Sequence, residues 1–254
     1  MRTVIVFMCN LTTDYIDDFM VRMAHHSTAI EGNSLTHGEA KSILIDNYLP
    51  RAMDMREMYE VLNYKNLIPF LVESIQGKVP ISPEFCKKIH SIICNNAIEG
   101  TPGEFKKIPN YVIGADWEPS PPYRVLTDLQ NWCLDTQYQI KDATCKEDIV
   151  SAICRQHIRF ERIHPFSDGN GRVGRALMIY SCFENHLAPI VIPVNCKKQY
   201  IALLNNSDET SFTALALELQ QEEYRRIKQI CGGEKINLII NKSSNKKQSY
   251  NLGR

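Results

Sequence analysis

The sequence lacks features that mark several classes of protein. No two cysteines stand in C-x-x-C spacing, so neither a zinc ribbon nor a thiol–disulfide redox motif is indicated. No segment approaches the roughly 20 apolar residues that are needed to span a bilayer. There is no excess of positive charge either, since 29 Lys and Arg balance 29 Asp and Glu. We therefore expect no nucleic-acid partner and no membrane partner, because both usually require a basic excess.

Features of an exported protein are also lacking. Residues 1–9 contain a short apolar run, but the run is too short for the apolar region of a signal peptide, and no convincing cleavage site follows. The nine cysteines are odd in number and scattered, which is typical of reduced, buried thiols. These observations predict a cytoplasmic protein.

Most of the chain has apolar residues at the 3.6-residue spacing of amphipathic helices. With 254 residues, of which 44% are hydrophobic, it can build one sizeable core. We predict a mainly α protein, with an N-terminal helical region over 1–50, a core over 51–230 and a frayed tail over 231–254. Helical patterns cover residues 14–31, 36–47, 52–76, 83–95, 125–139, 147–163, 170–185, 197–205 and 212–230.

The helical pattern is interrupted between residues 100 and 122, where prolines and glycines are frequent. Two short extended runs, at 105–108 and 111–113, flank a turn at Pro109–Asn110. This arrangement predicts a small β-hairpin on an otherwise helical protein. We call residues 103–114 the flap segment.

Residues 164–175, which read HPFSDGNGRVGR, are the segment whose residue types indicate a chemical function. The turn at Gly169–Gly171 lets backbone N–H groups converge at a helix N-terminus, which makes an anion site. Arg172 and Arg175 follow at helical spacing, and two guanidiniums suit an extended polyphosphate. Asp168 offers a hard oxygen ligand for a phosphate-bound Mg²⁺. His164 is a base that titrates near neutral pH.

This motif resembles the signature of the Fic family, H-P-F-x-[DE]-G-N-G-R-x-x-R. All nine specified positions match, at His164, Pro165, Phe166, Asp168, Gly169, Asn170, Gly171, Arg172 and Arg175. The resemblance extends over about residues 34–230 and implies a Fic-type helical bundle with a small β-hairpin flap. It also implies a protein adenylyltransferase, which transfers AMP from ATP to a Ser, Thr or Tyr hydroxyl of a target protein. Residues 51–230 would then be the catalytic core.

The resemblance also implies roles for individual residues. His164 would take the proton of the attacking hydroxyl, and Asp168 would hold Mg²⁺ on the ATP phosphates. The Gly169–Gly171 backbone, with Asn170, would bind the α-phosphate. Arg172 would hold the β-phosphate and Arg175 the γ-phosphate, while Phe166 would be a buried anchor.

Other family features are matched less sharply. Relatives that transfer phosphate have Lys where this chain has Gly171, so AMP transfer is favoured. Residues 200–206 resemble the stretch near the sugar and base, which assigns Tyr200 and Asn206 to nucleotide binding. The flap of relatives aligns the target by strand-like pairing. This role falls here on Lys106, Lys107, Ile108, Tyr111, Val112 and Ile113.

An upstream segment resembles the family's inhibitory motif, [ST]-x-x-x-E-[GN]. It reads Ser27-Thr-Ala-Ile-Glu31-Gly32, and on a helix Ser27 and Glu31 share one face. Gly32 would end that helix. The resemblance implies an autoinhibited enzyme in which Glu31 pairs with Arg175. Self-modification, removal of AMP from targets and homodimers also occur in the family.

Two alternative interpretations stay open. A metalloenzyme would use His157, Glu161 and His164, which lie at i, i+4 and i+7, but the second Glu-x-x-His of a di-iron site is lacking. A regulatory module would bind nucleotide without catalysis, but then His164 would have no role.

Overall fold

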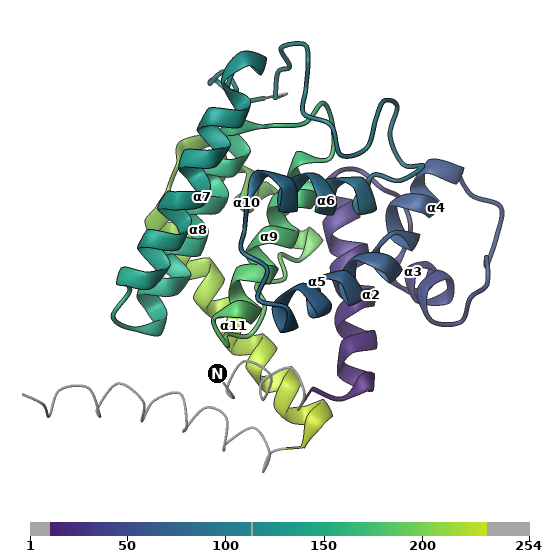
Figure 1. Cartoon of the computed structure of the whole chain (residues 1–254). Helices are drawn as coiled ribbons and strands as arrows, with labels where there is room; N and C mark the ends of the chain where they lie inside the picture. Colours follow the sequence, from purple (N-terminus) through teal and green to yellow (C-terminus); the bar gives the residue numbers. More distant parts are fainter. Residues whose placement is uncertain (1–10, 113, 233–254) are drawn as a thin grey trace, which may run out of the picture.

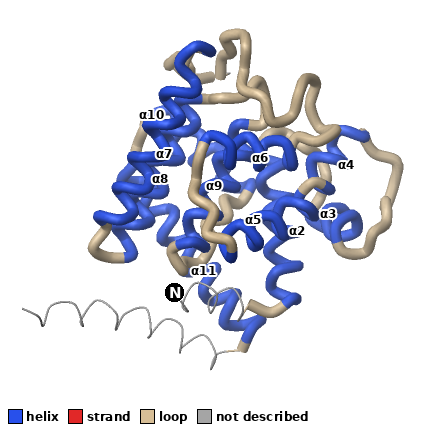
Figure 2. The backbone as a smooth tube through the Cα atoms, in the orientation of Figure 1, coloured by secondary structure: helices blue, strands red, loops and turns tan. Residues whose placement is uncertain are grey.

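The computed structural model describes residues 11–112 and 114–232. This part of the chain is helical, with no strand (Figure 2). Two short 3₁₀ helices, Pro122–Arg124 and Val194–Cys196, precede α7 and α10. The α-helices are α2 (Thr13–Ile30), α3 (His37–Leu44), α4 (Met55–Leu62), α5 (Tyr64–Gln76), α6 (Pro83–Ile93), α7 (Val125–Asp142), α8 (Lys146–Ile163), α9 (Asn170–Glu184), α10 (Lys197–Asn206) and α11 (Glu209–Cys231).

Helix α9 is the centre of the bundle (Figure 1). It packs against α8 and α6 and also contacts α2 and α5. Every residue of α9 except Gly171 and Glu184 is buried, as expected for a helix that is surrounded by others. Because the candidate motif begins α9, its side chains are held by several helices at once.

Most of the predicted helices are confirmed to within a few residues. Local signals explain their starts: the Thr12 side chain caps α2, and Thr36 with Glu39 forms a capping box on α3. The stretch over 52–76, however, is divided into α4 and α5 at Asn63. The Asn63 side chain donates hydrogen bonds to the carbonyls of Ile93 and Asn95, both at 2.8 Å. This long-range contact sets the junction.

The structure does not confirm the predicted hairpin, since the flap segment has no strand over its described residues. The physical reason lies in its hydrogen-bond partners. The Lys106 N–H donates to the carbonyl of Pro165 at 2.9 Å, and the Asn110 side chain donates to the carbonyl of Phe166 at 2.9 Å. Pro109 has no N–H to donate. The flap segment is therefore bonded to the loop of the motif rather than folded on itself.

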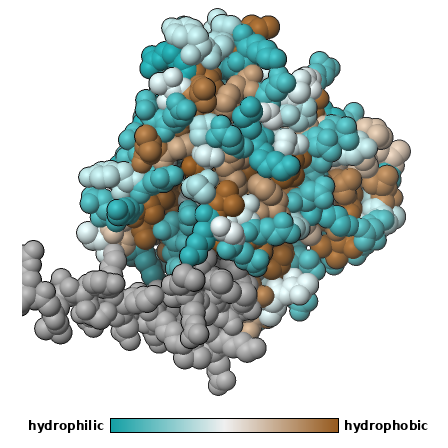
Figure 3. Space-filling view, in the orientation of Figure 1, coloured by the Kyte–Doolittle hydropathy of each residue, from teal (hydrophilic) through white to brown (hydrophobic). Residues whose placement is uncertain are grey.

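None of the helices in the described part combines the length and hydropathy that crossing a bilayer requires. On the face drawn in Figure 3, apolar residues are interspersed with polar ones. The cysteines of the described part are free thiols, and Cys86, Cys94, Cys133, Cys154 and Cys182 are buried. Most of the predicted tail, as well as Ile113, lies outside the described residues.

Candidate active site

The motif forms a tight loop between α8 and α9. His164 ends α8 in the left-handed conformation, with φ 49°, and Gly169 precedes α9 with φ 78°. The Asn170 side chain closes the loop, because it accepts from the Phe166 N–H at 2.9 Å and donates to the Phe166 carbonyl at 2.8 Å. The amide of Asn170 thus shapes the loop, while the first N–H groups of α9 have no intrahelical partner.

Phe166 anchors this loop in the core, where it is fully buried. Its ring stacks on His90 of α6, with centroids 3.9 Å apart. His90 in turn accepts from the Gly103 N–H through Nδ1, at 2.7 Å, and its Nε2 lies 3.1 Å from the Asp168 carbonyl. Because Nδ1 accepts, Nε2–H donates to that carbonyl. Burial lowers the pKa of His90 to about 4, which keeps the ring neutral as this arrangement requires.

His90 therefore ties both the flap segment and the motif loop to α6. It was not predicted from the sequence. The only sequence signal is a histidine within an amphipathic helix next to apolar residues, and such a residue is more often part of a core than of a site.

The imidazole of His164 is held in a form suited to a base. Its Nδ1 lies 3.2 Å from the Glu161 carbonyl, so Nδ1 carries the proton and Nε2 keeps its lone pair. Burial lowers the pKa of His164 to about 4; the Glu161 carbonyl opposes this shift and Lys106 reinforces it. The side chain is consequently neutral at physiological pH.

The Lys106 side chain is buried against the motif loop and is not exposed to a target. It is 5% exposed, and its Nζ donates to Asn110 Oδ1 at 2.7 Å and to the Ile163 carbonyl at 3.5 Å. Burial lowers its pKa to about 8. Of the other predicted flap residues, Lys107, Ile108 and Tyr111 are exposed and Val112 is half-buried.

Arg175 points away from the loop, toward α2. Its guanidinium is buried and donates to Ser27 Oγ at 3.0 Å, to the Ser27 carbonyl at 2.8 Å and to Glu31 Oε1 at 2.6 Å. Burial disfavours the charged form, but Glu31, together with Tyr200 and Tyr64, raises the pKa of Arg175. The chain turns away after Glu31 at Gly32, which has φ 108°.

Gly171 makes the approach of Glu31 possible. A Cβ at this position would collide with Glu31 Oε1 and would lie 2.9 Å from Arg175 Nη1. A side chain at residue 171 and the Glu31–Arg175 ion pair therefore exclude each other unless something shifts.

The Tyr200 ring lies next to the Arg175 guanidinium and is not exposed. Its side chain is fully buried, its hydroxyl is 2.6 Å from His157 Nε2, and the Arg175 guanidinium is 6.0 Å from its ring centroid. Asn206, by contrast, is the exposed last residue of α10. The structure thus joins Tyr200 to the motif through Arg175, whereas Asn206 has no such link in the described contacts.

Arg172 and Asp168 belong to a ring of four charged side chains, which we call the charge ring. Arg172 lies 3.2 Å from Glu60 and 3.3 Å from Asp168. Arg56 closes the ring, at 3.3 Å from Glu60 and 3.2 Å from Asp168. Both Arg56 and Glu60 lie on α4, and neither was predicted.

The metalloenzyme alternative requires three ligands on one face of a helix, and the structure does not place them so. His164 leaves the helical path as the left-handed cap. His157 and Glu161 are 3.8 Å apart but are both buried against α9, where burial raises the pKa of Glu161 to about 8. No cluster of three His, Cys, Asp or Glu side chains among the described residues is arranged to hold a metal.

A single carboxylate suits a metal that arrives bound to phosphate. Asp168 is 45% exposed at the start of α9, and phosphate and water oxygens complete such a coordination shell. The donor set therefore fits Mg²⁺ on a nucleotide and does not fit a resident metal held by the protein alone.

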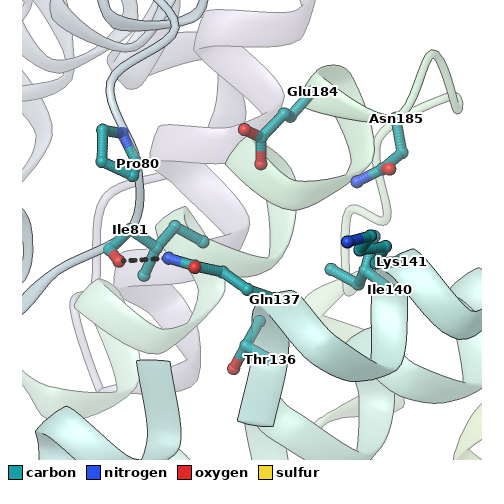
Figure 4. A pocket seen from close by; sticks show the side chains of 8 residues that line it. All are labelled: Pro80, Ile81, Thr136, Gln137, Ile140, Lys141, Glu184 and Asn185. Atoms are coloured by element: carbon teal, nitrogen blue, oxygen red, sulfur yellow. Dashed lines mark hydrogen bonds between the residues drawn. The ribbon is translucent and has the colours of Figure 1, made fainter. Parts of the chain in front are cut away.

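A cavity of about 310 Å³ lies at the other end of α9 (Figure 4). Pro80, Ile81, Gln137, Lys141, Glu184 and Asn185 are among its lining residues. The 15 residues of α9 separate it from the loop that precedes this helix, which corresponds to roughly 22 Å along a helix. It shares no residue with the loop that holds His164.

We compared the chain with known proteins. The Fic/DOC family model matches residues 80–182. "Protein adenylyltransferase fic-1" of Caenorhabditis elegans is 29% identical over 185 residues, which are 71% of this chain and 35% of that protein. "Protein adenylyltransferase Fic" of Drosophila melanogaster is 28% identical over 189 residues, 73% of this chain and 37% of that protein. The chain thus spans about a third of the length of these curated relatives.

Solved structures agree on the fold. A Fic domain containing signaling protein from Bacteroides thetaiotaomicron superposes with a TM-score of 0.78 at 21% identity, covering 91% of this chain and 96% of that one. Fic-1 from C. elegans gives a TM-score of 0.70 at 22% identity, covering 93% and 68%. The matched segment contains α6, α7, α8 and most of α9. The chain therefore has the fold of these Fic proteins, and its residues 80–182 match the Fic/DOC family model.

Proposed function

We propose that this chain is a protein adenylyltransferase, which transfers AMP from ATP to a hydroxyl side chain of a target protein. The observation that carries the proposal is the neutral imidazole of His164 in the loop that leads into the N-terminus of α9, because the free N–H groups of a helix N-terminus suit an anion. The names of the relatives, which are protein adenylyltransferases, support the same reaction.

In the proposed reaction, His164 Nε2 takes the proton of the target hydroxyl. The hydroxyl oxygen then bonds to the α-phosphorus of ATP, and the bond from that phosphorus to the bridging oxygen breaks, so that pyrophosphate leaves. The free N–H groups at the start of α9 stabilise the charge that develops on the α-phosphate. The position of ATP relative to the hydroxyl supplies much of the rate.

Mg²⁺ enters as part of the substrate, where it neutralises phosphate charge. Asp168 would hold it, and Arg172 would bind the β-phosphate and then the departing pyrophosphate. Arg175 would bind the γ-phosphate once Glu31 has left. The carboxylate of Glu31 and the γ-phosphate cannot occupy the same guanidinium edge, so the Glu31–Arg175 pair observed here would be autoinhibitory.

The flap segment would align the target. Its exposed Ile108 and Tyr111 are 77% and 79% accessible and present apolar surface next to the motif loop. We expect a target peptide in extended conformation to pair with the backbone of the flap segment in a strand-like way.

Labelled ATP tests the proposal. We expect the Glu31→Gly variant, with Mg²⁺ and a cell lysate, to transfer label to protein from the α-phosphate but not from the γ-phosphate. Glu31→Gly combined with His164→Ala should lose this transfer, and the same background with His37→Ala, an exposed histidine of α3, should keep it.

Two other outcomes would each indicate a different activity. Label from the γ-phosphate alone would identify a phosphotransferase and overturn the proposal. ATP that binds without any transfer would assign the chain to the nucleotide-binding modules.

A further inference from the structure

The charge ring has one member, Arg56, to which the proposed reaction gives no role. Arg56 lies on the first turn of α4, outside the Fic/DOC segment of 80–182. Its Nη2 is 3.2 Å from Asp168 Oδ2, the carboxylate that would hold Mg²⁺. A third guanidinium therefore stands beside the polyphosphate site, on an element that the motif does not include.

The two halves of the ring differ in burial. Arg172 and Glu60 have side chains that are 1% and 7% exposed, and the second oxygen of Glu60 accepts from Asn33 Nδ2 at 2.9 Å. This half is fixed by its surroundings. Arg56 and Asp168 are 60% and 45% exposed, and ion pairs between such exposed groups contribute little to stability. The Arg56–Asp168 contact is thus the part of the ring that exchanges readily.

Binding of Mg-ATP would change the partner of Arg56. Asp168 cannot serve the metal and keep its full interaction with Arg56, because both use the same carboxylate. Phosphate oxygens on the metal would then lie next to the place that Asp168 Oδ2 occupied. A guanidinium binds phosphate oxygens at least as well as it binds a carboxylate, because it can donate two parallel N–H groups to either one. Glu60, one turn further along α4 and 3.3 Å from Arg56, keeps the side chain directed toward the site.

We propose that Arg56 is a further nucleotide-binding residue, which exchanges Asp168 for the terminal phosphates of Mg-ATP. This inference rests on the proposed function, since it concerns the same site. Arg175 is held by Glu31 in the resting state, so Arg56 is the exposed cation through which a triphosphate first engages the site. Glu60 acts as a positioning residue for Arg56 and Arg172.

A purely inhibitory role for Arg56 would have the opposite effect on nucleotide binding. If Arg56 only held Asp168 closed, its removal would free the carboxylate and tighten the binding of Mg-ATP. If it binds phosphate, its removal weakens the binding of triphosphate and leaves AMP unaffected, because AMP has no β- or γ-phosphate.

Calorimetric titration with α,β-methylene ATP and Mg²⁺ separates these outcomes, because that analogue cannot release AMP. We expect Arg56→Met to weaken its binding about tenfold and Arg56→Lys less, with the affinity for AMP unchanged. Arg51→Met is the matched control, since Arg51 is also an exposed arginine and pairs with Glu39 away from the motif. It should bind like the wild type.

Unchanged or tighter binding of the analogue by both Arg56 variants, with wild-type thermal unfolding, would overturn the inference and leave the proposed function standing. If neither the wild type nor Glu31→Gly bound the analogue, the proposed function would fail and this inference with it.

Discussion

Removal of the carboxylate of Glu31 is the perturbation whose effect the structure defines best. In the resting state the γ-phosphate must displace Glu31 Oε1 from Arg175, where the two groups are 2.6 Å apart. A hydrogen bond between charged groups contributes about 1.5–3 kcal/mol. The Glu31 side chain is 39% exposed, and solvent screening reduces the value to about 1–2 kcal/mol. Arg175 keeps both hydrogen bonds to Ser27 in the variant, so its buried guanidinium stays hydrogen-bonded although it loses its carboxylate partner.

We therefore expect Glu31→Gln and Glu31→Gly to increase AMP transfer at subsaturating Mg-ATP by roughly 5–30-fold, which corresponds to about 1–2 kcal/mol. The same variants should lose stability, with a melting temperature lower by about 2–4 °C for each kcal/mol. Glu31→Gln keeps the length of the side chain at the end of α2, so it separates loss of charge from a change in the helix end. Transfer rates and thermal unfolding measured on the same preparations check both signs.

Glu209→Gln is the matched control. Glu209 pairs with Arg155 at 2.7 Å and is 41% exposed, so it resembles Glu31 in geometry, but it lies at the start of α11. It should leave the transfer rate unchanged. Rates and Mg-ATP affinities of both Glu31 variants within twofold of wild type would refute the reasoning, because the ion pair would then not compete with the nucleotide.

Two further predictions concern the base and the packing of the motif helix. Because burial lowers the pKa of His164 to about 4, the imidazole stays neutral above that pH, and kcat/KM should fall on the acid side near pH 4 rather than near 6.5. Lys106→Met removes a neighbouring positive charge and should move this fall to higher pH; a wild-type fall near pH 6.5 would contradict the assignment. Gly174→Ala should lower the free energy of unfolding by about 1–3 kcal/mol in urea titrations, since its methyl group would collide with Glu161. Gly38 is also in a helix but has open space around it, so Gly38→Ala should not destabilise the protein and should raise its free energy of unfolding by up to about 1 kcal/mol. Equal effects of the two substitutions would show that packing is not the cause.

Local patterns were sufficient to predict most of the fold. The helices depend on apolar spacing and on short-range caps such as Thr12 and Ser82, which are both visible in the sequence. The motif loop was also predictable, because its polar and glycine residues are contiguous. The predicted hairpin was not confirmed, because alternating residues around Pro109 do not show that the Lys106 N–H bonds to Pro165.

The charge ring and His90 could not be predicted for the same physical reason. Their partners are far apart in the sequence: Arg56 meets Asp168 across 112 residues, and His90 meets Asp168 across 78. Taken alone, an arginine on the exposed side of a short helix looks like a solvated residue. Only the packing of α4 beside the start of α9 gives it a partner of opposite charge.

The attachment of the flap segment has a consequence for changing substrate choice. Its backbone is pinned at Gly103 by His90, at Lys106 by Pro165 and at Gly114, whose carbonyl accepts from Asn205 Nδ2 at 3.2 Å. Between these fixed points Lys107, Ile108 and Tyr111 are exposed, and the three anchoring hydrogen bonds involve none of them. Libraries varied at these three positions can therefore be screened for new protein targets while the geometry of the chemical step stays constant.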